Sequence, residues 1–510
     1  MYKKAYYIKT KKHLLGNGID FVEVDDLYRY VILKNIRQII GFDLKGLIKE
    51  LISSGIERIE NFDFVDLKLA WYLIDSSRKF SSINELCDFL KTSHYSELLS
   101  KTLDIIKKEG LENLFDLEKK IQKILAFMEL EGISVDFEYL SSIEKKLKDE
   151  IDLLKKEMFG VIGFEFNPAS TKDLRHVLFD VLRLTPIKKR KTGYSTDDET
   201  LNFLENQSDF VKLLKKFRNL SKLLSTYILG LKEWIADDGK IHTTFRQDVV
   251  ATGRLSSINP NLQNLPSDEE NGTMIRRIFV AGEGRCFVSF DYSQIDLRVL
   301  AHECEDPEMI RFFVEDRDIH ESTARLIFGT DQITNEQRKF AKAINFGIVY
   351  GMEAYGLSKT LGISVEEASE FINLYFKKFA KVKDYFARIE NELDNFGYVK
   401  TFMGRRRYFK SWKTASKYEK KALFREAINM PIQGGSADVI KMAMVKVYEY
   451  IKSNKLDIKL VLQIHDELVF IFPENYDEKI LKDVSNIMES CVKLKVPLKV
   501  NYKSGISFKI

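Results

Sequence analysis

Cysteines are scarce in this sequence, and long apolar runs are absent. The four cysteines, Cys87, Cys286, Cys304 and Cys491, are widely separated and have no metal-ligand spacing. This pattern predicts reduced thiols in a cytoplasmic protein rather than a disulfide framework. No apolar run approaches membrane length and no signal-like apolar segment opens the sequence, so no membrane association is expected.

The sequence also has little net charge. Eighty Lys and Arg residues against 76 Asp and Glu residues give a net charge of +4, so any basic cleft for a polyanion must be local. The content of 45% hydrophobic and 31% charged residues is typical of a soluble globular protein. A chain of 510 residues is long enough for several domains.

A short acidic cluster interrupts an apolar stretch near the C-terminus. Residues 461–472 run from apolar positions into His465, Asp466 and Glu467 and then become apolar again. This pattern predicts two β-strands joined by a tight turn. Adjacent carboxylates repel each other, and a divalent cation such as Mg²⁺ would offset the repulsion. A hairpin with a solvated acidic tip is the alternative.

A second aspartate follows a predicted strand far away in the sequence. The strand over residues 286–290 ends at Asp291, and residues 292–298 open a helix. Two aspartates at strand ends meet if their strands pair in one sheet. Such a pair would hold two Mg²⁺ ions against a phosphate.

Two cations and two aromatic residues recur at every fourth position of a predicted helix over residues 336–351. They are Arg338, Lys342, Phe346 and Tyr350, and on a helix they form one stripe. The stripe suits a triphosphate followed by a sugar and a base, with arginine gripping phosphate and lysine acting as a compact charge. An ordinary surface helix with mixed basic and aromatic side chains is the alternative.

Weaker signals occur in several further segments. Arg425, Asn429 and Gln433 also step by four, and could reach acceptors in a minor groove or mark a helix N-cap and hinge. The polar loop over residues 249–266 suits hydrogen bonding to a polar ligand. Periodicity further predicts a strand and several helices. The strand covers residues 28–33, and the helices cover residues 43–53, 64–75, 139–156 and 198–231 and a stretch that begins at 117.

Together these segments resemble the family A DNA polymerases, of the bacterial DNA polymerase I type, over roughly residues 113–510. Residues 291–298 resemble motif A, residues 338–351 motif B and residues 465–467 motif C, while residues 252–257 and 261–264 resemble primer-template segments. The resemblance implies an α+β multidomain fold, the right-hand polymerase. Its thumb would cover about 138–237, its palm about 238–302 and 424–510, and its fingers about 303–423.

The resemblance also assigns roles. Asp291 and Asp466 would hold two Mg²⁺ ions, with Mn²⁺ able to substitute, and Lys342 would act as the catalytic acid for pyrophosphate. Glu467 would lie beside the metals as an accessory group. The nucleotide site would comprise Arg338, Lys342, Phe346, Tyr350, His320, Asp296 and Gln294. Primer-template DNA would contact Arg254, Asn261, Gln263, Arg425, Asn429, Gln433 and His465.

The implied activity is that of a DNA-directed DNA polymerase, a nucleotidyltransferase acting as a cytoplasmic monomer in DNA replication or repair. It would add dNTPs to a primer 3′-hydroxyl. Residues 1–112 resemble a degenerate 3′–5′ exonuclease domain of α/β type, with Leu47 where the proofreading aspartate belongs and no Asp-x-Glu pair beside a strand. We therefore expect no proofreading, and no 5′-nuclease activity because that domain is also missing.

One departure concerns sugar choice. Asp296 stands where the family has a glutamate, and the shorter side chain either leaves a gap beneath the sugar or draws Tyr350 inward through a hydrogen bond. Relaxed sugar or template choice, including RNA-templated synthesis, is therefore an alternative function. Three further functions compete with DNA-templated DNA synthesis: a single-subunit RNA polymerase, a non-catalytic DNA-binding subunit and a two-metal nuclease.

Overall fold

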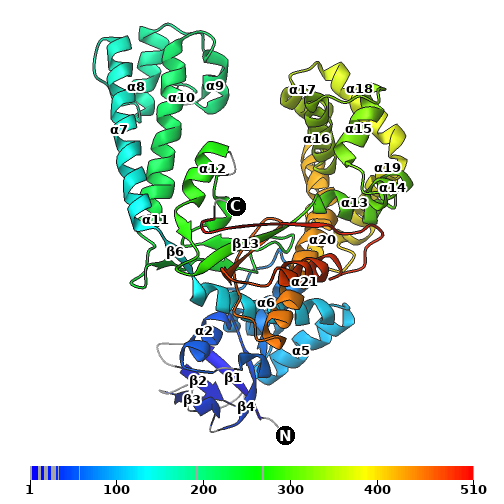
Figure 1. Ribbon diagram of the computed structural model, residues 1–510. Coiled ribbons are helices and arrows are strands. Elements are labelled where there is room, and N and C mark those ends of the chain that lie inside the picture. The colour runs from blue at the N-terminus through cyan, green and yellow to red at the C-terminus, as the bar shows by residue number, and fades with distance from the viewer. Residues whose placement is uncertain are drawn as a thin grey trace. The chain divides into compact units, whose positions relative to one another are not determined.

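The structure is a computed structural model that describes residues 3–9, 13–16, 21–24, 30–32, 34–56, 58–190, 193–266 and 269–508. The chain divides into two compact units. Unit 1 comprises Met1–Glu131, Thr244–Ile258 and Val288–Ser504, and unit 2 comprises Gly132–Thr243, Asn259–Phe287 and Gly505–Ile510. The predicted domain boundary near residue 112 stays a prediction. Figure 1 shows both units and labels many of their helices and strands.

Unit 1 begins with a five-stranded mixed sheet, drawn in dark blue in Figure 1. Its order is β3-β2-β1-β4-β5, with β4 parallel to both of its neighbours and β1, β2 and β3 antiparallel. Helix α2 (Lys45–Ser53) packs its buried Leu47, Ile48 and Leu51 into a hydrophobic core that it shares with this sheet. The strands are β1 (Lys3–Lys9), β2 (His13–Gly16), β3 (Phe21–Val24), β4 (Ile36–Gly41) and β5 (Asp63–Asp66).

Two predictions in this region are wrong. Residues 30–32 are helical rather than part of a strand, and residues 28, 29 and 33 lie outside the described residues. The helix predicted over residues 64–75 begins only at Leu67. Residues 63–66 form β5, and the Asp66 carboxylate accepts a hydrogen bond from the Lys68 backbone N–H, which caps the start of α3 (Leu67–Ile74).

Helix α6 (Glu112–Glu131) is the central element of the N-terminal part of unit 1. It packs against α2, α3, α5 (Tyr95–Lys108) and β5, and also against the long C-terminal helix α20 (Lys417–Ser453). Because so many neighbours surround it, eleven of its residues are buried, including the polar Glu118 and Gln122. The predicted helix is present, but it begins at Glu112 rather than near residue 117. Two smaller elements nearby are η1 (Ile59–Asn61) and α4 (Ile83–Leu90).

A four-stranded sheet of unit 1 joins segments that are far apart in the sequence. Its order is β16-β17-β13-β18, and β16 pairs with β17 in an antiparallel hairpin. The sheet therefore places the predicted hairpin directly beside the predicted strand that ends at Asp291. Its strands and flanking helices are β13 (Arg285–Tyr292), β16 (Lys459–Ile464), β17 (Glu467–Pro473), β18 (Val500–Gly505), α13 (Ile295–Cys304) and α21 (Glu478–Glu489).

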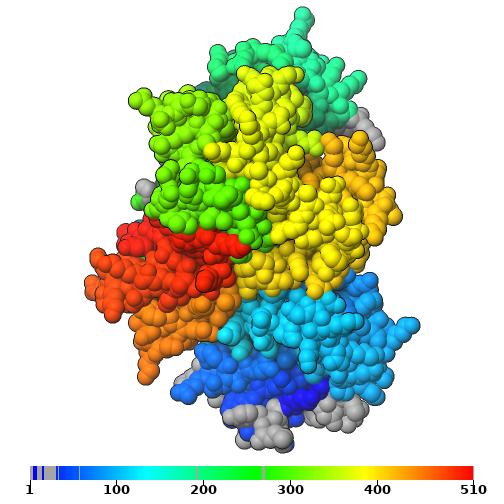
Figure 2. Space-filling view, turned by 90° about the vertical axis from the view of Figure 1, so that its right-hand side faces the viewer, coloured from blue at the N-terminus to red at the C-terminus, as the bar shows by residue number. Residues whose placement is uncertain are grey.

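A helical region of unit 1 lies between α13 and α20. Side-chain caps fix its helix starts, as in the capping boxes at Thr334 and Ser364. In Figure 2 the surface near residue 405 adjoins that near residue 105, where Arg406 pairs with Glu109 and Lys410 with Asp75. The elements are α14 (Pro307–Val314), α15 (Ile319–Phe328), α16 (Asn335–Val349), α17 (Ala354–Leu361), α18 (Val365–Lys378), α19 (Ala380–Phe396), β14 (Tyr398–Lys400) and β15 (Arg406–Tyr408).

Unit 2 contains a long helical hairpin. Helix α7 (Phe137–Ile162) packs on α10 (Asp209–Lys222), and the predicted stripe of α7, from Leu140 to Leu154, is buried as expected. A small sheet in the order β12-β6-β9 closes the unit. The remaining elements are β6 (Ile133–Val135), α8 (Thr171–Arg175), η2 (His176–Val181), β7 (Lys189–Arg190), β8 (Gly193–Tyr194), α9 (Asp198–Leu204), η3 (Leu223–Leu229), α11 (Gly230–Lys232), β9 (Lys240–Ile241), η4 (Leu262–Asn264), α12 (Glu269–Arg276) and β12 (Phe279–Val280). Among the described residues, no helix combines the length and apolar character that crossing a membrane requires.

Four fully buried charges lie where the N-terminal part of unit 1 meets α20. The guanidinium of Arg405 lies 2.6 Å from Glu118 Oε1 and donates through Nε to Asp438 Oδ1 at 2.8 Å. The ammonium of Lys441 donates to the same Glu118 oxygen at 2.6 Å. None of these four side chains is more than 2% exposed. Two cations and two anions thus balance each other in the interior.

Neutral donors complete this buried charge cluster. Gln247 Nε2 donates to Glu118 at 2.7 Å, and the Thr401 hydroxyl donates to Asp438 at 3.0 Å. Although burial opposes ionisation, Lys441 and Arg405 lower the pKa of Glu118 to about 2. Each charge loses hydration on burial, so the cluster tolerates the loss of no single member.

Removing the charge of Glu118 should therefore destabilise unit 1. We expect Glu118→Gln to cost about 3–5 kcal/mol at pH 7, because Arg405 and Lys441 would then share only one buried carboxylate. The folded-state pKa of Glu118 is depressed, so its contribution is present above its ordinary value of 4.5 and is lost as the pH falls toward 2. Thermal unfolding at pH 7, 5 and 4 should show that the difference in stability between wild type and Glu118→Gln becomes smaller below pH 4.5.

A matched control is Glu97→Gln, which removes an exposed carboxylate paired with Lys101. It should leave the stability of the protein almost unchanged, because an exposed ion pair contributes little. A gap between wild type and Glu118→Gln that widens on acidification would contradict the role assigned to this carboxylate.

Candidate functional site

The sheet brings together the two strand-end aspartates. Asp291 lies near the end of β13, and Asp466 lies in the turn between β16 and β17. The backbone N–H of Tyr292 donates to the carbonyl of Asp466 at 3.1 Å, which joins the two segments directly. His465 takes a positive φ of 50°, which tightens the turn. The predicted hairpin is confirmed, and the condition for the two aspartates to meet is fulfilled because β17 pairs with β13.

The surroundings of both aspartates disfavour their charged forms. Burial and then Asp296 raise the pKa of Asp466 to about 7, against the opposing effect of Arg254 and with a further contribution from Asp291. Although the Asp291 side chain reaches solvent, the protein around it and Glu467 raise its pKa to about 6. Glu467 itself accepts a hydrogen bond from the Ser289 hydroxyl.

This excess of negative charge fits a divalent cation. Carboxylate oxygens are ligands that Mg²⁺ prefers, and a nearby cation would relieve the repulsion between them. In the described part of the chain, no group of three or more His, Cys, Asp or Glu side chains forms a ready-made metal cage. Mg²⁺ usually keeps waters and substrate phosphates among its ligands, so Asp291 and Asp466 suffice as the protein's share.

Asp296 is the hub of a small hydrogen-bond network next to these aspartates. It is 6% exposed and accepts hydrogen bonds from the Ser436 hydroxyl at 2.6 Å, Tyr350 Oη at 3.2 Å and Arg254 Nη2 at 3.3 Å. Of the two arrangements expected for the shorter side chain, the structure has the one in which Tyr350 is bonded to Asp296. Gln294 precedes α13 with a φ of 55° and is half-buried.

The predicted stripe lies on α16, but its two cations differ. Arg338 donates through Nε and Nη2 to Asp318 Oδ2, at 2.9 and 2.6 Å. Lys342 is exposed and has no ion pair within the described part of the chain. The rings of Phe346 and Tyr350 are stacked, with centroids 6.2 Å apart and planes at 23°. In the stripe, Lys342 is thus free to meet a ligand, whereas Arg338 is already paired with Asp318. The two aromatic rings that follow are stacked.

His320 is buried behind this stripe. Its Nδ1 accepts from the Asn345 amide at 2.9 Å, and the Thr323 hydroxyl donates to the same amide at 3.1 Å. Burial lowers the pKa of His320 to about 4, so the imidazole is neutral at pH 7. Its ring lies 5.6 Å from that of Phe346. His320 can therefore offer a phosphate a hydrogen bond but no positive charge.

The second set of stepped polar residues lies inside α20. The alternative of a helix N-cap and hinge is wrong, because Arg425, Asn429 and Gln433 occupy the interior of a helix that begins at Lys417. The Asn429 amide donates to the Arg425 carbonyl at 2.8 Å and to the Tyr350 carbonyl at 3.4 Å. Its buried Oδ1 has no partner within the described part of the chain.

The remaining predicted contacts belong to a separate unit. Asn261 and Gln263 are in unit 2, where the Asn261 side chain accepts from the Gln263 backbone N–H at 3.0 Å and caps η4 (Leu262–Asn264). All other predicted site residues are in unit 1. Sequence reasoning missed three partners of these residues. Asp318 could have been noticed as an N-cap beside His320, whereas nothing in the sequence marks Asn345 or Ser436.

A glycine lets the loop before Arg254 rest on the buried charge cluster. Gly253 has a φ of 87°, and a Cβ atom there would lie 2.5 Å from Arg405 Nε. The loop backbone thus lies directly against a guanidinium that Glu118 and Asp438 hold in place. Arg254, the next residue, reaches Asp296 from this position.

Comparison with known proteins identifies relatives of the whole chain. The family model of DNA polymerase family A matches residues 137–510. DNA polymerase I of Caldicellulosiruptor bescii is 39% identical over 529 aligned residues, covering 99% of this chain and 61% of the relative. DNA polymerase I of Geobacillus stearothermophilus is 42% identical over 486 residues, covering 91% and 56%. The chain thus spans about three fifths of the length of these relatives.

Among solved structures, the POL domain of Pol1 from M. smegmatis, in complex with DNA primer-template and dNTP, has a TM-score of 0.89 to this structure. It is 31% identical, and the match covers 99% of this chain and 95% of that one. The mixed helix and sheet architecture is therefore that of a polymerase domain.

The contact between Gly253 and Arg405 can be tested with a matched pair of glycines. Alanine at Gly253 or at Gly404, whose φ is 94°, imposes left-handed strain of about 1–2 kcal/mol. Only at position 253 would the added methyl group strike a fixed side chain, whereas nothing lies within 4 Å of it at position 404. Calorimetry should show losses of about 2–5 kcal/mol for Gly253→Ala and about 1–2 kcal/mol for Gly404→Ala. Equal losses would contradict the proposed support.

Proposed function

The chain belongs to DNA polymerase family A, and on this basis we propose that it is a template-directed DNA polymerase that adds dNTPs to a primer 3′-hydroxyl. One observation carries the proposal: neighbouring strands β13 and β17 bring together Asp291 and Asp466 in surroundings that raise the pKa of both. Because the chain covers only part of its curated relatives, the activity is argued from the site itself.

The proposed division of labour follows the expected right-hand arrangement. The four-stranded sheet with α13 and the latter part of α20 would be the palm, α14 to α19 the fingers, and the hairpin of α7 and α10 the thumb. The occurrence of both aspartates on the sheet and of the cationic stripe on α16 supports this assignment. The protein would act as a monomer.

Asp291 and Asp466 would hold two divalent ions, Mg²⁺ or Mn²⁺, with Glu467 beside them. When bound, such ions stabilise the charge that develops on the attacking and leaving oxygens in phosphoryl transfer. The protein's contribution is to fix one carboxylate on β13 and the other in the adjoining β16–β17 turn, so that they are placed before substrate arrives.

The stripe on α16 would bind the incoming nucleotide. Lys342 is free to approach the triphosphate and to supply a proton to the leaving pyrophosphate, while Arg338 would have to share or exchange its partner Asp318. Neutral His320 would donate through Nε2. The stacked rings of Phe346 and Tyr350 would pack on the sugar and base.

Primer-template DNA would contact the residues around this site. Arg425 is exposed, and Asn429 holds a buried acceptor without a partner, so both retain capacity for groove contacts. Gln433, His465 and Arg254 would complete the contacts in unit 1. Asn261 and Gln263 of unit 2 are proposed to contribute as well.

The N-terminal domain is proposed to lack proofreading. Two aspartates in its described part already serve other groups: Asp66 accepts from the backbone N–H groups of Asp43 and Leu44, and Asp63 pairs with Lys119. Leu47, where a catalytic aspartate would be expected, is buried in the core. These contacts support a structural role, expressed through α6 and the buried charge cluster.

The metal assignment is tested by primer extension. Asp291→Ala and Asp466→Ala should each reduce Mg²⁺-dependent extension at least about 1000-fold, because metal stabilisation supplies several kcal/mol of the barrier lowering. Duplex affinity should change little, since it comes mostly from phosphate contacts elsewhere. Asp331→Ala, at an exposed position in the α15–α16 connection, serves as the control and should extend normally. Extension by either mutant within tenfold of wild type would overturn the assignment.

Sugar choice is tested at Asp296 and Tyr350. Because Tyr350 is already bonded to Asp296, no gap is left for the longer side chain to fill, and Asp296→Glu should lower the ratio of rNTP to dNTP kcat/KM by no more than a few-fold. Tyr350→Phe removes the hydroxyl that binds Asp296 at 3.2 Å and should raise this ratio several-fold, because the ring is no longer held. If both variants keep the wild-type ratio, this pair does not select the sugar.

A further inference from the structure

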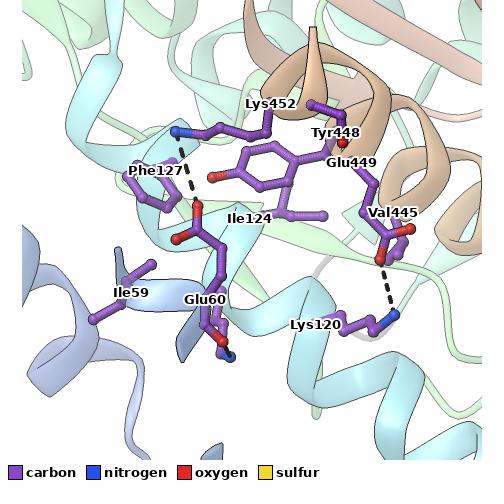
Figure 3. Close-up of a pocket in the computed structure, with 11 residues that line it drawn as sticks. Ile59, Glu60, Lys120, Ile124, Phe127, Val445, Tyr448, Glu449 and Lys452 are labelled. Carbon is purple, nitrogen blue, oxygen red and sulfur yellow. Dashed lines mark hydrogen bonds and ion pairs between the residues drawn. The ribbon is translucent and has the colours of Figure 1, made fainter. Parts of the chain in front are cut away.

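A pocket of about 470 Å³ lies in unit 1 between the N-terminal domain and the C-terminal part of α20. Figure 3 shows that its lining comes from three separate segments: η1, α6 and α20. Its volume falls within the range of pockets that bind small molecules. Tyr448 follows Gln433 by 15 residues on α20, about 22 Å along a helix, so the pocket is separate from the candidate active site.

The interior of the pocket is apolar and aromatic. Ile59, Ile124 and Val445 contribute buried aliphatic surface. The rings of Phe127 and Tyr448 lie 5.8 Å apart, with their planes tilted by 33°. This lining suits a flat hydrophobic ring that packs against the aliphatic and aromatic side chains.

Ion pairs lie on either side of this apolar interior in Figure 3. Lys120 is held by Glu449 at 2.8 Å, whereas Lys452 lies 4.0 Å from Glu60 and is therefore only loosely paired. The Lys452 ammonium is 4.9 Å from the ring centre of Phe127 and 5.5 Å from that of Tyr448. It is thus held over the aromatic wall with capacity for another partner.

A third lysine gives the pocket an excess of positive charge. Lys123 donates to the carbonyls of Phe62 at 2.5 Å and Glu60 at 3.3 Å, and it forms no ion pair with a carboxylate of the described residues. The lining therefore contains three lysines and two glutamates. A ligand with one negative charge would neutralise this excess.

The hydroxyl of Tyr448 is the most specific indication of what kind of ligand the pocket binds. Its oxygen is buried, and it has no hydrogen-bond partner within the described part of the chain. A buried hydroxyl without a partner is costly, and an acceptor on a ligand would remove that cost. Because Lys452 lies over the same ring, one anionic group could accept from the hydroxyl and pair with the ammonium together.

We propose that this pocket binds a small planar aromatic molecule carrying one anionic group, of the aryl carboxylate class. Its ring would pack against Ile124, Val445 and the Phe127–Tyr448 wall, and its carboxylate would accept from Tyr448 Oη beside Lys452. Such a ligand would bridge the N-terminal domain and α20. This inference is independent of the proposed polymerase activity.

Binding of 2-naphthoate to the full chain, measured by isothermal titration calorimetry, tests the proposal. A ligand of this size in a fitting pocket should bind with a Kd of about 1 mM or tighter. Neutral 2-naphthamide should bind at least tenfold more weakly, because it lacks the charge that matches the lysine excess. Adenosine monophosphate, which carries two charges and a sugar, should bind more weakly than 2-naphthoate.

Two pocket variants and two controls on the same helix locate the site. Tyr448→Phe removes only the hydroxyl and should weaken 2-naphthoate binding about tenfold. Lys452→Met keeps an apolar stem over the rings and should weaken it about fivefold. Tyr418→Phe and Lys446→Met change an exposed tyrosine and an exposed lysine of α20 and should leave the affinity unchanged.

The outcomes separate clearly. Loss of affinity in both pocket variants but in neither control supports the assignment. Any one of four results would overturn it. They are no binding by wild type at about 10 mM, equal binding of 2-naphthoate and 2-naphthamide, tighter binding of adenosine monophosphate than of 2-naphthoate, and unchanged affinity in Tyr448→Phe and Lys452→Met. Primer extension is not a readout here, so failure of this proposal is distinguishable from failure of the proposed activity.

Discussion

The buried charge cluster of Glu118, Arg405, Asp438 and Lys441 is the interaction on which the organisation of unit 1 depends. Burying four charges is expensive, and the cost is offset only while all four remain paired at hydrogen-bond distances. This requirement fixes α6 against α20 and against the turn between β14 and β15. A shift of any of these elements would leave a charge unpaired. The cluster therefore constrains their positions more strongly than apolar packing alone, because apolar surfaces tolerate small shifts.

The cluster also connects the N-terminal part of unit 1 to the candidate functional site. Arg405 lies directly against the loop backbone at Gly253. The next residue of the loop, Arg254, donates a hydrogen bond to Asp296, which also accepts one from Tyr350. The N-terminal part of unit 1 thus has a structural role: its helix α6 supplies the Glu118 carboxylate around which the cluster forms. The surroundings of Asp291 and Asp466 act in the opposite way: they raise the pKa of both carboxyl groups, which supports the proposal that a cation binds there.

Much of this site could be predicted from the sequence, because the signals were local. The alternation of apolar and polar residues marked the hairpin at Asp466 and the strand at Asp291, and a spacing of four marked the stripe on α16. The partners could not be predicted in this way. Ser436 and Asp318 are ordinary polar residues in the sequence, and only the fold shows that they hold Asp296 and Arg338.

The three arginines at 405–407 looked alike, yet Arg405 alone is fully buried. Residues 63–66 form a strand because they extend a sheet whose other strands lie up to 60 residues earlier, which a local helical period cannot reveal.

The central claim is that one buried cluster holds several distant segments of unit 1 in place, and amide hydrogen exchange of an Arg405→Lys variant tests it most directly. Lysine keeps the charge but cannot bond Glu118 and Asp438 at once as the guanidinium does. The account predicts faster exchange than in wild type in three places: around Glu118 in α6, around Asp438 in α20, and in the loop over residues 250–254. An increase confined to residues 398–408, next to the substitution itself, would contradict it.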